Sequence, residues 1–159
     1  MIIRPATPAD LGFCHDCARL FSEETQYPVL YDAQTSQRTF WAYINDPLRD
    51  ILIAEADGIP LGGVMLVCSH EFSERPFCYI VKLFVLPLAR GSTAGRLLMQ
   101  ATADWAAKAG CSHIFANAGA SISARHDSVA GNLYRRCGFA DAGAAFVKAL
   151  DPNQPERIN

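Results

Sequence analysis

The sequence lacks a strong charge of either sign, and it also lacks a long hydrophobic run. Its 159 residues include 14 Lys and Arg against 16 Asp and Glu, which gives a formal net charge of -2. The basic residues are scattered along the chain, so we expect no nucleic-acid partner. The longest apolar stretch begins at Gly62 and closes around Cys68, well short of the about 18 residues of a membrane span. Residues 1–5 also lack the features of a signal peptide, so we expect a cytoplasmic protein that does not enter a membrane.

Two common nucleotide-binding motifs are missing as well. The chain has no G-K-[ST] of a nucleoside-triphosphate loop and no G-x-G-x-x-G of a dinucleotide fold. Metal-ligand spacing is also absent, because the pair Cys14 and Cys17 has no second pair and the histidines are isolated. The six cysteines mostly occupy apolar positions. We therefore expect reduced thiols and no bound metal.

The hydrophobic periodicity predicts one domain with a fixed order of strands and helices. Hydrophobic residues make up 50% of the chain, which at this length is enough for one core. Asp57 and Gly58 separate two β-rich runs and predict a two-residue hairpin turn. The order β-α-α-β-β-β-α-β-α-β-β is that of an α+β protein, loosely α/β, with a mixed sheet. The predicted elements are strand 1–6, a helix from Thr7 past Phe21, helix 32–45, strands 51–56, 59–69 and 78–86, helix 92–109, strand 113–117, helix 126–137 and a hairpin within 139–150.

The junction between predicted strand 78–86 and helix 92–109 has the composition of a phosphate-binding loop. Small residues there let several backbone N–H groups point into one concavity at the positive end of the helix dipole, and two arginines add charge. A pyrophosphate would be held well at such a place. The alternative is that Gly91 and Gly95 only permit a tight turn and close helix packing. The candidate binding residues are Arg90, Gly91, Ser92, Thr93, Ala94, Gly95 and Arg96.

Two motifs resemble the GNAT superfamily of N-acetyltransferases. Residues 90–95 are similar to its loop pattern of Gln or Arg, two residues, Gly, one residue, then Gly or Ala, with Thr93 at the first Gly position. Asp127 stands where the family frequently has Asn, and the opening strand and the element order also resemble the superfamily. The family spacing Ala-x-x-x-Tyr-x-x-x-Gly-Phe is matched by Ala130, Tyr134, Gly138 and Phe139.

The resemblance implies an acetyltransferase that takes the acetyl group from acetyl-CoA and passes it to an amine by direct attack. It implies that strand 78–86 bulges and separates from a parallel neighbour, so that Phe84 and Val85 line a slot for the pantetheine arm. It also implies that Tyr134 lies near the thioester sulfur and protonates the departing thiolate, a role suited to a donor with a pKa of about 10. The implied N-acetyltransferase domain spans residues 1–150, followed by a tail at 151–159.

The acceptor and the base that deprotonates it stay open. The predicted strand 78–86 offers only Lys82 as a charged residue where many relatives carry a glutamate. This absence permits a second hypothesis, a non-catalytic acyl-CoA-binding sensor or interaction domain, which the retained Tyr134 argues against. A homodimer is also left open. Candidate bases elsewhere are Glu23, Glu24, Asp32 and Glu55. Aromatic residues around the implied acceptor cleft favour a small-molecule or peptide amine with an apolar portion, and these are Phe21, Tyr27, Tyr31, Trp41, Phe72 and Phe77.

Overall fold

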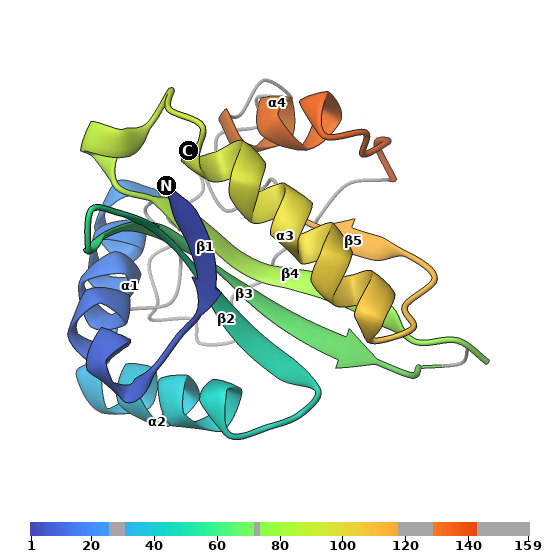
Figure 1. Cartoon of the computed structure of the whole chain (residues 1–159). Coiled ribbons are helices and arrows are strands. Elements are labelled where there is room, and N and C mark those ends of the chain that lie inside the picture. Colours follow the sequence, from blue (N-terminus) through green and yellow to red (C-terminus); the bar gives the residue numbers. More distant parts are fainter. Residues whose placement is uncertain (26–30, 72–73, 118–128, 143–159) are drawn as a thin grey trace, which may run out of the picture.

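The computed structural model describes residues 1–25, 31–71, 74–117 and 129–142. These residues form a five-stranded mixed sheet with helices on both faces (Figure 1). The strands lie in the order β1-β2-β3-β4-β5, and the expected α+β class is confirmed. The strands are β1 (Ile2–Pro5), β2 (Arg49–Ala56), β3 (Ile59–Ser69), β4 (Phe77–Val85) and β5 (Ile114–Ala116). The helices are α1 (Leu11–Thr25), α2 (Ala33–Ile44), α3 (Ala94–Lys108) and α4 (Val129–Arg136), with short 3-10 helices η1 (Pro8–Asp10) and η2 (Pro87–Ala89).

Local sequence signals account for most of the element ends. Asp57 and Gly58 both adopt positive φ angles, 52° and 77°, which is the geometry of the tight turn predicted between β2 and β3. The Asp32 carboxylate accepts a hydrogen bond from the backbone N–H of Thr35 and caps α2. Gly110 ends α3 in the left-handed region. The hairpin predicted within 139–150 differs in its first part, because residues 139–142 belong to no strand, and its remainder lies outside the described residues.

Two apolar clusters lie on the two faces of the sheet. The larger one joins α3 and α4 to the sheet and includes Leu66, Ile80 and Leu98, all buried. The smaller one lies between the sheet and the pair α1 and α2, where Phe40 packs with Ile53. In Figure 1, α3 crosses the near face of the sheet, whereas α1 and α2 lie at its other side. The sheet therefore separates the chain into two layers with different helices.

Strand β4 is the place where the regular sheet is interrupted. Its antiparallel register with β3 shifts between the pairs Met65 with Lys82 and Leu66 with Ile80, so that Val81 is an extra residue on β4. On its other side β4 pairs in parallel with β5 only over residues 78–80, although β4 continues to Val85. The expected bulge is confirmed. The described part of β5 ends at Ala116, so residues 81–85 of β4 extend beyond their pairing with it, and the expected separation of the two strands stays a prediction.

Candidate active site

The start of α3 presents backbone donors at the end of β4. The first turn of a helix leaves N–H groups without helical partners, and their positive end attracts anions. Among the hydrogen bonds of the described residues, none is donated by the backbone N–H of Thr93, Gly95 or Arg96. The N–H of Ala94 is engaged by the Ser92 hydroxyl at 3.2 Å. This junction therefore has several backbone donors free to receive an anionic group.

The two glycines of the junction have different structural roles. Gly91 has a φ of 83°, a conformation that favours glycine, and a Cβ added there would meet nothing within 4 Å. Gly95 lies in α3, and a Cβ there would come within 3.0 Å of the Leu133 side chain of α4. The turn and packing roles considered from the sequence are thus both present. They coexist with the free N–H groups, because these groups belong to the backbone.

The two arginines of the junction are placed differently from each other. Arg90 donates to the Val85 carbonyl at 3.1 Å and forms an ion pair with Glu24 of α1, and its guanidinium lies 5.5 Å from the Phe84 ring centroid. Arg96 is exposed on the first turn of α3. The charge of Arg90 is therefore already paired with α1, and Arg96 is the arginine that remains open to an anion.

Phe84 and Val85 lie on opposite faces of β4 beside the interruption in the sheet. Phe84 is buried and borders the pocket under α1 and α2, whereas Val85 packs into the α3 cluster. Gly62 of β3 lies opposite, where a Cβ would come within 2.8 Å of the Phe84 carbonyl oxygen. The missing side chain thus lets β3 pair closely with this end of β4. Both predicted slot residues lie in the part of β4 that extends beyond its pairing with β5.

Tyr134 is buried in α4 on the α3 side of the sheet. Its ring centroid lies 5.4 Å from that of Phe139, and it belongs to the same apolar cluster as Val85 at the end of β4 and Ala116 at the end of β5. Burial raises the pKa of Tyr134 to about 12. The hydroxyl is therefore protonated at neutral pH and able to donate a proton or a hydrogen bond.

A pocket of about 480 Å³ opens on the other face of the sheet, beneath α1 and α2. Its walls are mostly apolar and include the thiols of Cys14 and Cys17. Burial raises the pKa of each thiol to about 12. Hydroxyl groups line the side of the pocket that is formed by α2 and by Tyr31, the residue before the N-cap of α2. One of these, Tyr31, contacts the Nδ1 atom of His15 at 3.2 Å. The apolar lining residues are Phe13, Cys14, Cys17, Ala18, Phe21, Phe40, Ile51, Ile53, Gly63, Met65, Val81 and Phe84.

Among the described residues, two charged side chains line this pocket. Lys82 comes from the bulge of β4, and its Nζ lies 4.2 Å from the ring centroid of Phe21. Burial lowers the pKa of Lys82, because the charged form loses contact with water. Asp32 comes from the cap of α2, where the hydrogen bonds from Thr35 hold the pKa of its carboxyl below the ordinary value. One charge of each sign therefore faces the pocket.

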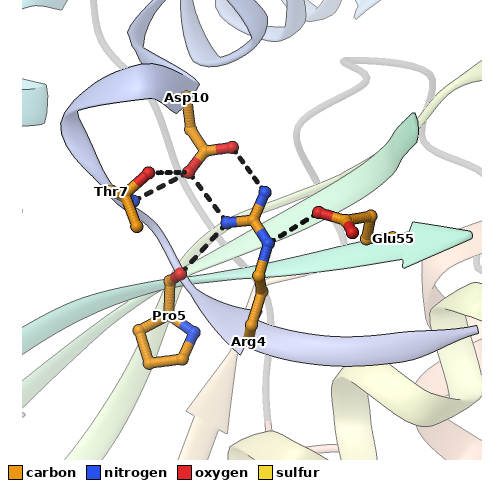
Figure 2. Close-up of polar contacts among 5 residues, drawn as sticks. All are labelled: Arg4, Pro5, Thr7, Asp10 and Glu55. Atoms are coloured by element: carbon orange, nitrogen blue, oxygen red, sulfur yellow. Dashed lines mark hydrogen bonds and ion pairs between the residues drawn. The ribbon is translucent and has the colours of Figure 1, made fainter. Parts of the chain in front are cut away.

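The carboxylates considered as bases are mostly engaged elsewhere. Glu55 forms an ion pair with Arg4 at 2.6 Å, and Arg4 also holds Asp10 through two hydrogen bonds of 2.8 Å (Figure 2). Glu24 pairs with Arg90, and Glu23 pairs with Arg19 one helical turn away. Asp32 alone of the four candidates lines the pocket.

Some of the predicted acceptor-side aromatics lie away from the pocket. Phe21 and Tyr31 line it, whereas Trp41 packs edge-on against Phe40 and is 37% exposed. Phe77 instead packs edge-on against Tyr79 and Phe115. Tyr27 and Phe72 lie outside the described residues.

Neither a metal site nor a membrane span is found in the part of the chain that the structure describes. No three His, Cys, Asp or Glu side chains come together there as possible ligands, and none of its helices is long and apolar enough to cross a bilayer. The described cysteines are free thiols, with Cys111 Sγ 3.7 Å from Cys68 Sγ.

Comparison with known proteins decides the family. Residues 15–139 match the profile of the Acetyltransferase (GNAT) family, which is most of the chain. The chain belongs to the GNAT acetyltransferase family. The expected membership of the superfamily is thereby confirmed, and an acetyltransferase is the class of enzyme expected from it.

Relatives of this GNAT acetyltransferase include enzymes that modify aminoglycosides. The aminoglycoside N(6')-acetyltransferase type 1 of Stenotrophomonas maltophilia is 27% identical over 131 residues, which cover 71% of this chain and 82% of the relative. The structure of AAC(6')-Iy with the bisubstrate analogue CoA-S-monomethyl-acetylneamine has a TM-score of 0.74 at 16% identity, with 93% of this chain and 96% of that chain covered.

A third similar structure is the aminoglycoside acetyltransferase meta-AAC0020 from an uncultured soil metagenomic sample, solved with sisomicin. Its TM-score is 0.72 at 20% identity, with 94% of this chain and 96% of that chain covered. At these identities the two structures establish the shared fold.

The sequence motifs of the GNAT acetyltransferase did not reveal the pocket. Its walls come from α1, α2 and three strands, so no short pattern marks them. One usable signal was Lys82, a charged residue within an otherwise apolar strand. Gly63 was another, because a glycine in the interior of a strand often marks a close approach or an opening.

Proposed function

We propose that this GNAT acetyltransferase transfers the acetyl group of acetyl-CoA to the amine of a small molecule. The observation that carries the proposal is the break in the sheet at β4, with backbone donors on one side and a pocket on the other. Such a break would join the two compartments that a two-substrate transfer needs. A domain that only senses an acyl-CoA would have no use for the second compartment.

The start of α3 would hold the diphosphate of the donor. The N–H groups of Thr93, Gly95 and Arg96 supply hydrogen bonds, and the exposed Arg96 adds a positive charge. Gly91 gives the turn that brings the loop back toward the helix. From residue 81 to Val85 the edge of β4 extends beyond its pairing with the described part of β5, and its backbone would then hydrogen-bond the amides of the pantetheine arm.

The chemical step is the replacement of a thioester by an amide. The acceptor nitrogen forms a bond to the carbonyl carbon, the carbon–sulfur bond breaks, and the sulfur leaves as a thiolate that must be protonated. Tyr134 would supply that proton from the α3 side, because its raised pKa keeps it protonated and its ring lies in the apolar cluster between the helices and the sheet. Backbone N–H groups of β4 would polarise the thioester oxygen as negative charge develops.

The acceptor would enter from the pocket under α1 and α2. Its amine must lose a proton before attack, since an ordinary alkyl ammonium has a pKa of about 10.4. The pocket offers the Asp32 carboxylate and the Tyr31 hydroxyl, which contacts His15, as groups through which that proton can pass to solvent. The volume of about 480 Å³ suits a small molecule.

The proposal is tested by measuring thiol release from acetyl-CoA across a panel of small amines, with the acetylated product identified by mass spectrometry. We expect acceptor-dependent release of one thiol for each amide formed. CoA at a hundredfold excess over its Kd should also stabilise the fold by about 2.7 kcal/mol, whereas NAD should not. Binding of CoA without transfer to any amine would favour the sensor hypothesis.

A further inference from the structure

Three cysteines gather at the end of the sheet that lies away from the proposed donor loop. Cys68 is the residue before the last of β3, and Cys78 is paired with it near the start of β4. Cys111 follows the C-terminal end of α3, whereas the proposed phosphate donors lie at the N-terminal end of that helix. The Sγ atoms of Cys111 and Cys68 are 3.7 Å apart, and both residues are free thiols. The proposed acetyl transfer uses neither of them.

The position of Cys111 is determined by the way in which α3 ends. Gly110 has a φ of 74°, and its N–H donates to the Ala107 carbonyl at 3.0 Å. The N–H of Cys111 donates to the Ala106 carbonyl at 2.9 Å. These two hydrogen bonds form a Schellman motif, in which the residue after the left-handed glycine packs its side chain back against the helix. The Cys111 side chain accordingly packs on the apolar cluster between α3 and the sheet.

The position of Cys68 is determined by the sheet. Its N–H donates to the Leu48 carbonyl at 2.7 Å, and its Cα is paired with that of Cys78. Two separate sets of backbone hydrogen bonds thus bring together the sulfurs of residues that are 43 positions apart. A disulfide bond is about 2.05 Å long, so the two sulfurs need to approach by less than about 2 Å. Cys111 belongs to a connection rather than to a strand, so it is the residue that can make this shift.

We propose that Cys68 and Cys111 are a redox-sensitive pair that forms an intramolecular disulfide with a low-molecular-weight disulfide, such as glutathione disulfide, as the oxidant. The Cys111 thiolate attacks one sulfur of the oxidant, which forms a mixed disulfide and releases the first glutathione thiol. The Cys68 thiolate then attacks the Cys111 sulfur, so that the bond between the two cysteines forms and the second glutathione thiol leaves. The protein loses two protons and two electrons, and the oxidant is reduced to two thiols.

The exposure of the thiols determines the order of these two steps. Cys111 is half-buried, whereas Cys68 is 5% exposed and Cys78 is 0% exposed. An oxidant in solution therefore reaches Cys111 first. Burial raises the pKa of Cys111 to about 11, so little thiolate is present at neutral pH and the first step is slow. Excess reductant keeps the pair as thiols, and sustained oxidation converts it.

The disulfide would join the end of β3 to the connection that follows α3. The closed loop then contains all of β4 and α3. A cross-link between residues 43 positions apart restricts the unfolded chain, so the oxidised protein should be more stable than the reduced one. We expect the Tm to rise by about 5 °C or more on oxidation. The link lies away from the start of α3, so it leaves the proposed donor loop open.

The test treats the full chain with glutathione disulfide at about pH 8.5, where more thiolate is present. The intact mass should fall by about 2 Da with no glutathione retained, and dithiothreitol should restore both the mass and the lower Tm. Cleavage by chymotrypsin after Phe77 separates Cys68 from Cys78, so mass spectrometry of the linked peptides identifies the pair. A link that maps to Cys78, or to Cys14 and Cys17, in place of the proposed pair would overturn the inference.

Matched variants connect the rise in Tm to this pair. Cys111→Ala should show neither the loss of mass nor the rise in Tm, whereas Cys137→Ala, which removes a half-buried thiol at the end of α4, should respond as the wild type does. Cys78→Ala should also form the disulfide. Thermal unfolding of each reduced variant shows that it is folded. A glutathione that stays on Cys111 of the wild type, or a rise in Tm that survives in Cys111→Ala, would contradict the proposal.

Discussion

The α3 side of the sheet and the α1/α2 side differ in what forms their binding features. On the α3 side the free donors are backbone N–H groups at the start of a helix, and the side chains around them are small. On the α1/α2 side the pocket is formed by side chains from two helices and three strands. A feature made of backbone is compatible with many sequences, whereas a feature made of side chains belongs to one chain.

This difference bears on the two halves of the proposed reaction. The proposed donor site consists of backbone groups in a loop of small residues before a helix, so a sequence motif can locate it. The proposed acceptor pocket consists of side chains from distant segments, so no motif locates it. Changes on the α3 side should therefore alter donor binding or the chemical step for all acceptors. Changes on the α1/α2 side should alter the choice of acceptor and leave the donor unaffected.

The largest effect is expected from Tyr134→Phe, on the α3 side. The variant keeps the ring that packs against Phe139 but loses the proposed proton donor. We expect turnover to fall about tenfold to a thousandfold for every acceptor, with CoA affinity and stability unchanged. Because the pKa of Tyr134 is about 12, wild-type turnover should show no fall from this group between about pH 8 and 10.

Acyl donors with a more acidic thiol provide the control for Tyr134→Phe, since a better leaving group needs less protonation. The loss should shrink for such donors. Turnover at the wild-type rate, with the chemical step shown to be rate-limiting, would make Tyr134 a packing residue.

The next largest effect is expected on stability, from the ion pairs that Arg4 forms with Asp10 and Glu55 next to the start of α1. Arg4 holds the pKa of the Asp10 carboxyl down at about 2, through two hydrogen bonds (Figure 2). A carboxyl whose pKa is lower in the folded state stabilises the fold above its unfolded pKa, and this stability is lost as the pH falls from about 5 to about 1, through both pKa values. We expect Asp10→Asn to lower the free energy of unfolding at pH 7 by about 2 kcal/mol.

Urea unfolding of the wild type and of Asp10→Asn at a series of pH values checks this prediction. The difference between the two proteins should be full above about pH 5 and should vanish near about pH 1, below both pKa values. Asp16→Asn, an exposed change on α1, is the control. A difference that is independent of pH would mean that the carboxylate charge does not stabilise the fold.

A smaller effect is expected on the pocket side from Ala18→Phe. Ala18 lines the pocket from α1, and a phenyl ring there would occupy space needed by the acceptor. We expect kcat/KM for the best acceptor to fall about tenfold, while CoA binding stays unchanged. Asp16→Phe adds the same ring on the exposed side of α1 and should leave both unchanged. Loss of CoA affinity in Ala18→Phe would contradict the separation of the two sides.

Local signals made the fold predictable, and long-range contacts made the pocket unpredictable. The turn at Asp57 and Gly58 and the end of α3 at Gly110 depend on neighbouring residues, so the sequence pattern located them correctly. The pairing of Arg90 with Glu24 joins residues 66 positions apart. No local pattern shows that the first arginine of the loop is directed toward α1. The sequence thus shows that Arg90 belongs to the loop, but it does not show the ion pair of Arg90 with Glu24.

The same reasoning applies to the candidate bases. Glu55 looked available in the sequence, but the fold places it beside Arg4, 51 positions away. Lys82 was visible as the charged residue of its strand, whereas its contact with Phe21 depends on how α1 lies over the bulge. Charges become site residues only through packing of distant segments, which a single sequence does not display.

The smallest effect is expected from Gly95→Val compared with Arg96→Ala, both at the start of α3. Valine at position 95 adds atoms beside a free N–H and also meets the Leu133 side chain, which lies within 3.0 Å of an added Cβ. We expect CoA binding to weaken about fivefold in Gly95→Val and about twofold in Arg96→Ala, because an exposed charge contributes little. Calorimetry with CoA measures both values. The double variant Gly95→Val with Leu133→Ala separates the two causes, since it relieves the contact with α4 but keeps the bulk near the donors. If CoA affinity returned to the wild-type value in that double variant, Gly95 would be required for helix packing alone, and the backbone donors would have to be probed elsewhere in the loop.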